Sequence, residues 1–120
     1  MGEEIKGKKA MDKRTNRCIK AFIASIAAQN PEFIKAYLFG SYAKGNQKID
    51  SDIDLALVFN HIDDKDKFDL QVQLMLQASE FDIRIEPHPI SREDFYSPNP
   101  FAAEIRRTGI EIKPKAAKLV

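Results

Sequence analysis

The chain has 120 residues, a formal net charge of +1 and 43% hydrophobic residues. This length predicts one domain over residues 1–120 with a real hydrophobic core, and lysine-rich, frayed ends at about 1–11 and 114–120. The balanced charge excludes the broad basic surface that dominates nucleic-acid binding, so no nucleic-acid partner is expected.

The first half of the chain predicts one helix and two strands. Residues 12–29 form an amphipathic helical pattern whose apolar stripe includes Cys18, so this cysteine is expected to pack in the core. Residues 33–39 are mostly apolar or aromatic, which is typical of a short buried strand. A second strand is predicted over about 53–59, where both faces become apolar, as in a strand inside a covered sheet.

The second half predicts further helices and strands. A helix is expected over about 66–79, with one apolar stripe made of Phe68, Val72, Met75 and Leu76. A third strand is predicted over about 81–86, and Pro87 either ends it or places it at a sheet edge. The remaining elements are short helices over 91–95 and 101–108 and an edge strand over 110–112. Together these elements predict an α/β (α+β) fold.

The cellular location is also predicted from the sequence. No segment is long or apolar enough to span a membrane, and the N-terminus lacks a signal-peptide pattern. The single cysteine excludes an intrachain disulfide and fits a reducing compartment. A cytoplasmic protein with no membrane partner is therefore expected.

The turn after the first strand is suited to phosphate binding. Gly40 lacks a side chain, so the backbone can bend sharply and a ligand can approach closely. Ser41 stands where a helix N-cap would stand, and the free N–H groups at a helix start can bind phosphate oxygens. Lys44 adds a positive charge close by, and Gly45 ends the turn. Gly40, Ser41 and Lys44 are thus the candidate phosphate-binding residues.

Two carboxylates stand at the start of the second strand. Asp52 and Asp54 fall on one strand face, roughly 7 Å apart at the backbone. Close carboxylates repel each other when ionised, so a cation is their natural partner, and Mg²⁺ prefers carboxylate and phosphate oxygens. An isolated Asp-x-Asp is usually a solvated turn or a strand start. Its combination with the preceding strand and glycine turn is what indicates a metal site.

This combination resembles the signature of the DNA polymerase β-like nucleotidyltransferase superfamily. The resemblance covers residues 37–59, where Gly40-Ser41 is followed after ten residues by Asp52-x-Asp54. The form of the motif is similar to the minimal nucleotidyltransferases of prokaryotes, which are often encoded beside a small helical HEPN protein as an antitoxin–toxin pair. Residues 85–89 and 99–101 also resemble this branch. The resemblance implies the nucleotidyltransferase fold, a small mixed β-sheet flanked by helices.

Members of the superfamily use a third acidic residue on a later strand, and two residues compete for that role. Asp82 and Glu86 share one face of the third predicted strand, but their backbones would be roughly 13 Å apart. We favour Glu86, although aspartate is commoner in the superfamily, and expect Asp82 to be a surface residue paired with Arg84. His88, in a Pro-His-Pro turn, could contact substrate or simply pack.

The resemblance implies a Mg²⁺-dependent transfer of AMP from ATP, or of another nucleoside monophosphate, to a hydroxyl on a partner HEPN toxin. Gly40 and Ser41, with Lys44, would hold the phosphates. Asp52 and Asp54 would bind two Mg²⁺ ions, or Mn²⁺ in their place, and Glu86 would assist as a ligand or base. Two alternatives stay open: a non-catalytic module that neutralises a partner by masking it, and a nucleotidyltransferase acting on a small molecule.

Overall fold

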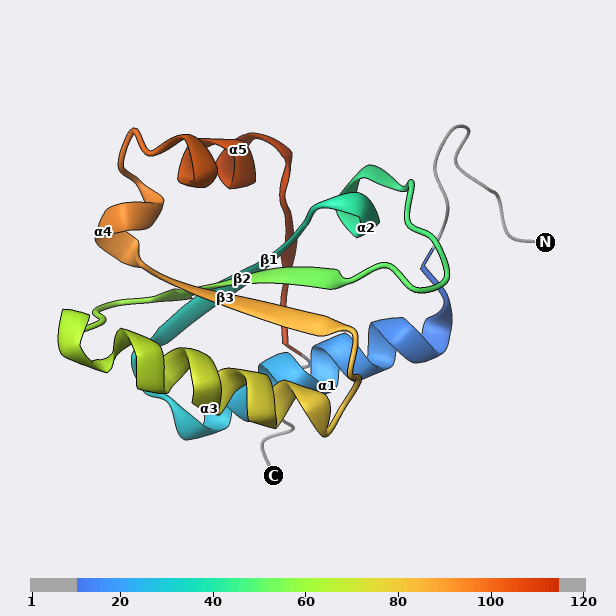
Figure 1. Cartoon of the computed structure of the whole chain (residues 1–120), viewed down its shortest axis with the longest axis horizontal. Helices are drawn as coiled ribbons and strands as arrows, with labels where there is room; N and C mark the ends of the chain where they lie inside the picture. Colours follow the sequence, from blue (N-terminus) through green and yellow to red (C-terminus); the bar gives the residue numbers. More distant parts are fainter. Residues whose placement is uncertain (1–10, 115–120) are drawn as a thin grey trace, which may run out of the picture.

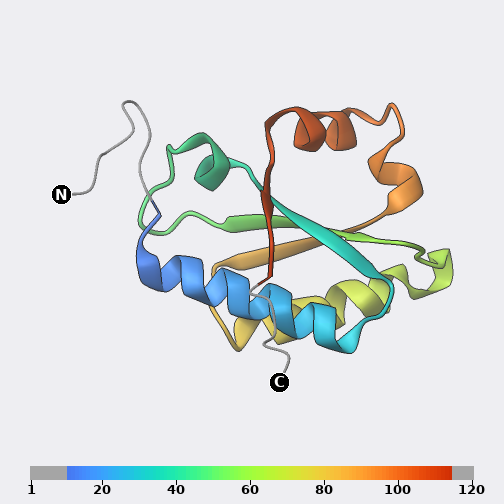
Figure 2. The same ribbon diagram turned by 180° about the vertical axis from the view of Figure 1, so that it is seen from behind.

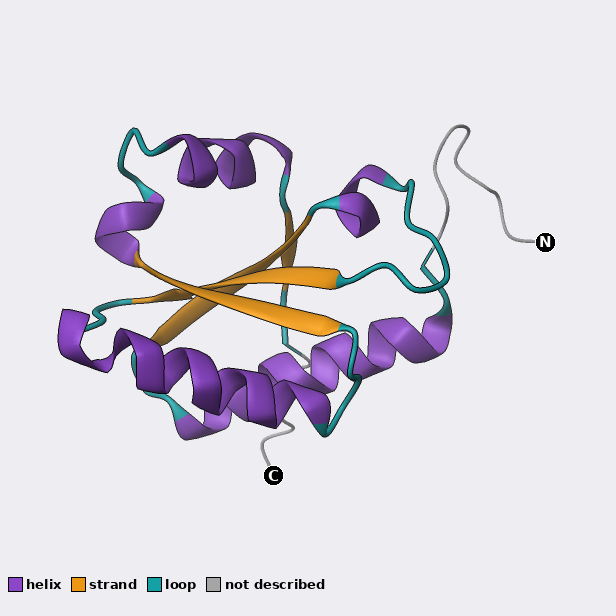
Figure 3. Cartoon of the chain, in the orientation of Figure 1, coloured by secondary structure: helices purple, strands orange, loops and turns teal. Residues whose placement is uncertain are grey.

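A four-stranded sheet lies between two groups of helices in the computed structural model, which describes residues 11–114 (Figures 1 and 3). The elements in chain order are α1 (Lys13–Gln29), β1 (Phe33–Phe39), α2 (Ser41–Lys44), β2 (Ile53–Phe59), the 3₁₀ turn η1 (Asp64–Asp66), α3 (Lys67–Ser79), β3 (Ile85–Ser91), α4 (Arg92–Phe95), α5 (Pro100–Thr108) and β4 (Ile110–Ile112). The predicted α+β fold is confirmed, and most boundaries lie close to those expected.

The sheet is mixed, with the strand order β3-β2-β1-β4. Strand β1 pairs antiparallel with β2 and β4, whereas β2 pairs parallel with β3. Parallel neighbours need a crossover connection, which α3 supplies. β2 therefore lies inside the sheet, and its start is held rigidly between β1 and β3.

Two apolar clusters cover the two faces of the sheet. The larger cluster joins α1 and α3 to one face, and its fully buried members include Phe22, Leu55 and Leu74. The smaller cluster packs Phe95 of α4 and Ile105 of α5 against the opposite face. Figures 1 and 2 show α1 and α3 running together beneath the sheet, with α4 and α5 on its other side.

The expected frayed ends lie outside the described residues, except for Met11, which is half-buried against the larger cluster, and Pro114. Cys18 is half-buried and not at the centre of the core. In the described part of the chain, none of the helices combines the length and apolar character that a membrane crossing requires.

The apolar stripe predicted for α3 faces outward and is not the side of the helix that packs on the sheet. Leu74 and Ala78 of α3 are buried against the sheet, and Leu70 packs beside them. The four predicted residues are exposed, Phe68 by 76% and Leu76 by 66%. The helix carries apolar side chains on two sides, so periodicity alone cannot decide which side faces the core.

The third strand begins later than predicted, at Ile85 instead of residue 81, and it continues through Pro87 to Ser91. Residues 81–84 form the turn that follows α3, and the N–H of Asp82 donates to the carbonyl of Ala78. Proline is tolerated here because β3 is an edge strand and can leave one side of its backbone unpaired.

Candidate active site

The turn after β1 brings backbone directly against a carboxylate of β2. Gly40 has φ +75° and ψ −151°, a region that is essentially reserved for glycine. A Cβ atom at this position would lie 2.5 Å from Asp54 Oδ2, so glycine is needed for the close approach as well. The expectation that Ser41 is the N-cap is wrong: Gly40 holds that position, and Ser41 is the first residue of α2.

Replacing Gly40 with alanine is expected to lower transfer about 100-fold, since a displacement of about 1 Å at a catalytic group has that effect. The substitution forces an unfavourable φ and pushes the new Cβ into the Asp54 carboxylate. Gly45→Ala is the matched control, because Gly45 also has φ +75° but ends α2 in the ordinary left-handed region. Nucleotidyl transfer and thermal unfolding of both variants test this; equal losses in the two would contradict it.

Lys44 lies at the end of α2 opposite to Gly40 and is exposed. The pKa of Glu104 on α5 is lowered, chiefly by a hydrogen bond from Arg107 and to a smaller extent by the charge of Lys44. The lysine therefore stands near α5, while the first N–H groups of α2, which lack intrahelical partners, stand beside Asp54. The structure does not bring Lys44 among the acidic side chains described next.

Strand register places Asp54 and Glu86 side by side. Asp54 is the second residue of β2, Glu86 is the second residue of β3, and the parallel register pairs them directly. Side chains two residues apart on a strand share a face, so His88 follows on the same side. All three lie on the sheet face that carries α4 and α5, near the N-terminal end of β2.

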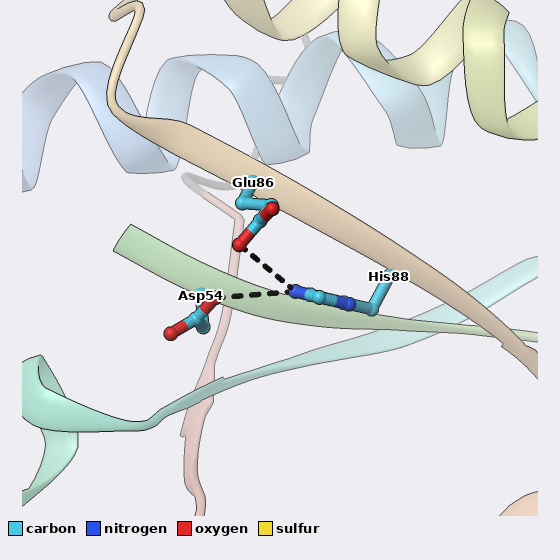
Figure 4. A group of neighbouring side chains, drawn as sticks. All are labelled: Asp54, Glu86 and His88. Carbon is cyan, nitrogen blue, oxygen red and sulfur yellow. Dashed lines mark hydrogen bonds and ion pairs between the residues drawn. The ribbon is translucent and has the colours of Figure 1, made fainter. Parts of the chain in front are cut away.

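These three side chains form the acidic cluster, defined as Asp54, Glu86 and His88 (Figure 4). The Nε2 atom of His88 lies 3.2 Å from Asp54 Oδ1 and 3.7 Å from Glu86 Oε1. One potential ligand atom from each residue falls within 4.8 Å of the other two. The imidazole packs against Phe39 at 5.1 Å and Phe101 at 6.1 Å between ring centroids, which fixes the ring plane.

Mutual repulsion marks the electrostatics of the acidic cluster. The pKa of Glu86 is raised, first by its hydrogen-bonding contact with Asp54, then by burial and by the charges of Asp52 and Asp54, while His88 opposes the rise. A carboxyl whose pKa rises beside another carboxyl is more stable when a proton or a cation lies between the two. The cluster therefore favours a positive charge at its centre.

Asp52 precedes β2, is exposed and lies outside the acidic cluster, although its charge reaches Glu86. Asp82 is far less exposed than expected for a surface residue, with 14% of its side chain accessible. The guanidinium of Arg84 donates to it twice, from Nε to Oδ1 at 3.0 Å and from Nη2 to Oδ2 at 2.8 Å, and the backbone N–H of Arg84 donates to Oδ1 at 2.9 Å. These bonds lower the pKa of Asp82 and commit its carboxylate to Arg84.

Arg84 links three parts of the fold around the turn before β3. Besides Asp82, it donates to the Tyr42 hydroxyl at 2.9 Å and to Thr15 Oγ1 at 3.0 Å. Tyr42 belongs to α2 and Thr15 to α1, so Arg84 anchors the glycine turn to the body of the protein. Sequence reasoning recognised Arg84 only as a partner for Asp82, because its other two partners are distant in the chain.

The donor set of the acidic cluster fits a divalent cation. It offers oxygen atoms from two carboxylates and one imidazole nitrogen, all ligand types that divalent metals accept. Because Gly40 has no side chain, Asp54 Oδ2 can face the turn directly. A phosphate bound at the turn could then coordinate the same ion as Asp54. Sequence reasoning left the role of His88 open, although the spacing Glu86-x-His88 already places both side chains on one strand face.

Comparisons with known proteins identify the family and the fold of the chain. A family model described as polymerase beta, nucleotidyltransferase matches residues 22–116. A candidate nucleotidyltransferase from Sulfolobus solfataricus superposes with a TM-score of 0.57 at 24% identity, covering 82% of this chain and 78% of that one. No curated protein matches at a significant level.

Two other similar structures are toxin–antitoxin complexes. One contains AMP-PNP; its TM-score is 0.55 at 23% identity, with 80% of this chain and 73% of that chain covered. The other is a tri-AMPylated Shewanella oneidensis HEPN toxin in complex with an MNT antitoxin, with a TM-score of 0.53 at 19% identity and coverages of 83% and 73%. At these identities the likeness establishes the fold, and the predicted nucleotidyltransferase fold is confirmed.

Proposed function

This chain belongs to the polymerase beta nucleotidyltransferase family, and from that premise we propose that it transfers AMP from ATP to a hydroxyl group with the help of Mg²⁺. One observation carries the proposal. The glycine turn meets Asp54 so closely that even a Cβ atom at Gly40 would be in contact with the carboxylate, and Glu86 stands beside Asp54 in register. A triphosphate held by the turn would therefore lie against the acidic side chains.

The triphosphate would bind at the turn between β1 and α2. The backbone N–H groups that begin α2, and the hydroxyl of Ser41, can donate to phosphate oxygens. Lys44 is a less direct candidate, because it lies at the other end of α2. A triphosphate bound here would lie near Asp54, since a Cβ atom at Gly40 would be only 2.5 Å from Asp54 Oδ2.

Asp54 and Glu86 would hold the metal, and Asp52 would complete the set from the loop before β2. When bound, Mg²⁺ or Mn²⁺ neutralises the triphosphate and lowers the pKa of the attacking hydroxyl. The protein's own contribution is mainly positioning, as in other phosphoryl-transfer sites. β2 is paired on both sides, so its carboxylate is held on a rigid element.

The acceptor we propose is a side-chain hydroxyl, such as that of a tyrosine, on a helical HEPN-family toxin. The support is that one similar structure contains a tri-AMPylated HEPN toxin with its MNT antitoxin, and that another toxin–antitoxin complex contains AMP-PNP. The chain itself would then act as an antitoxin that modifies its partner.

A masking module is the second candidate, and a specific observation favours it. The outward face of α3 exposes Phe68, Val72, Met75 and Leu76, a continuous apolar stripe of the kind that binds other proteins. A protein that neutralised its partner only by covering it would need such a surface and no metal.

Mass spectrometry of the partner separates the two functions. The purified chain is incubated with ATP, Mg²⁺ and a HEPN-family protein of the kind proposed as its partner, and the mass of the intact partner is measured. We expect one or more added AMP masses, with pyrophosphate released, and no addition in excess EDTA. No addition is expected when ATP is replaced by an analogue with a methylene group between the α- and β-phosphates, because the bond that must break is then blocked. Tight binding of the partner without any added mass would favour masking.

A further inference from the structure

The half-buried imidazole of His88 points into the acidic cluster, although nothing in the motif accounts for it. Its Nε2 atom faces both carboxylates, as Figure 4 shows. Phe39 and Phe101 pack against the ring from the neighbouring strand and from α5. With two aromatic neighbours, the ring has little freedom to turn its nitrogen elsewhere.

The distances around Nε2 match those between neighbouring ligands of one ion. Two atoms that each lie about 2.1 Å from the same metal are separated by about 3.0 Å at a right angle and by about 4.2 Å when opposite. The separations of 3.2 Å to Asp54 and 3.7 Å to Glu86 fall between these limits. A small shift of each side chain would therefore suffice to place one cation in contact with all three.

We propose that His88 is a nitrogen ligand of the cation in this site and that it shifts the preference of the site from Mg²⁺ towards Mn²⁺ and other transition-series divalent ions. This rests on the metal-dependent function proposed above. Mg²⁺ prefers oxygen ligands, whereas an imidazole nitrogen raises affinity in the order Mn²⁺, Fe²⁺, Co²⁺. An all-oxygen site would lack this bias.

The competing role for His88 is that of a hydrogen-bond donor that only orients Asp54. Glutamine distinguishes the roles, because its amide can still donate to the Asp54 carboxylate but its nitrogen does not coordinate metals. The chain contains two histidines, so His61 provides a matched control. His61 lies in the loop after β2 and pairs with Asp63 at 2.7 Å.

Pulsed EPR of bound Mn²⁺ is the decisive measurement. Protein labelled with ¹⁵N only in histidine is loaded with Mn²⁺ alone, and electron spin-echo modulation is compared with that of unlabelled protein. We expect a histidine ¹⁵N coupling in the wild type, the same coupling in His61→Gln, and its loss in His88→Gln. Because His61→Gln retains only His88, this variant decides the question even if His88→Gln fails to fold.

The ion preference gives a second readout by calorimetry. The ratio of the Mg²⁺ to the Mn²⁺ dissociation constant should fall about tenfold in His88→Gln and stay unchanged in His61→Gln. Absence of the coupling in wild-type protein, or its loss in His61→Gln, would overturn the proposal. Neither measurement depends on transfer: a chain that binds Mn²⁺ through His88 but adds no AMP would refute the proposed function alone, and a chain that adds AMP without the coupling would refute only this inference.

Discussion

Asp54→Asn is expected to abolish nucleotidyl transfer, by at least about 10³-fold, while the protein remains folded. Amide and carboxylate have nearly the same shape, but an amide is a poor ligand for a hard cation. Asp54 lies at the centre of the site, between the glycine turn and the Glu86 and His88 side chains. The measurement is the rate of AMP addition to the partner at saturating ATP and Mg²⁺.

Thermal unfolding and one control complete this test. Because Asp54 raises the pKa of Glu86, removing its charge relieves a repulsion, and Tm at neutral pH should stay equal or rise. Asp50→Asn is the matched control, since Asp50 is exposed in the loop before β2 and should tolerate the change. Asp52→Asn should behave like Asp54→Asn if its loop brings it to the metal. Transfer at a wild-type rate in Asp54→Asn would exclude this residue as a ligand.

The parts of the site that are local in sequence could be predicted from sequence. Gly40 and the Asp52-x-Asp54 motif stand in one short stretch of sequence, so a phosphate site and a metal site can be predicted there without knowing the sheet. Gly40, and not Ser41, occupies the N-cap, because the required backbone conformation excludes other residues. That detail depends on the contact with β2, which no local pattern contains.

The errors concern positions that depend on packing between elements. Helix α3 has apolar side chains on two sides, and only the position of the sheet selects Leu74 and Ala78 over the larger residues of the exposed stripe. Pro87 was predicted either to end strand β3 or to place it at a sheet edge, and the second alternative is correct, because β3 continues through Pro87 as an edge strand. The sequence could not choose between the two alternatives, because the position of a strand in the sheet is a tertiary property.

The same reasoning explains why the third acidic residue could not be chosen firmly from sequence. Asp82 and Glu86 both fit an alternating pattern, and only the register of β3 against β2 separates them. The turn before β3 directs Asp82 to Arg84, while the strand directs Glu86 to Asp54. The role of Glu86 as the third carboxylate remains a prediction. The cytoplasmic location, which concerns the whole protein, also remains a prediction.

Glu86→Gln and Asp82→Asn should therefore separate activity from stability. Glu86→Gln is expected to reduce transfer by about 10²–10⁴-fold, as the loss of a metal ligand or general base does. Its effect on stability should be small, because the carboxylate faces another negative charge. Asp82→Asn is expected to leave transfer within about threefold of wild type and to cost about 1–3 kcal/mol of folding free energy, since it breaks a partly buried, charge-assisted pair.

The stability loss in Asp82→Asn should also depend on pH in a defined direction. Arg84 lowers the pKa of Asp82 in the folded protein, so the pair stabilises the native state above the unfolded pKa, and the stabilisation disappears as pH falls through the lower, folded value. The Tm difference between wild type and Asp82→Asn should accordingly be full at neutral pH and shrink in acid. Loss of transfer in Asp82→Asn with retained transfer in Glu86→Gln would reverse the two roles and would require β3 to shift by about four residues, which the direct pairing of Glu86 with Asp54 opposes.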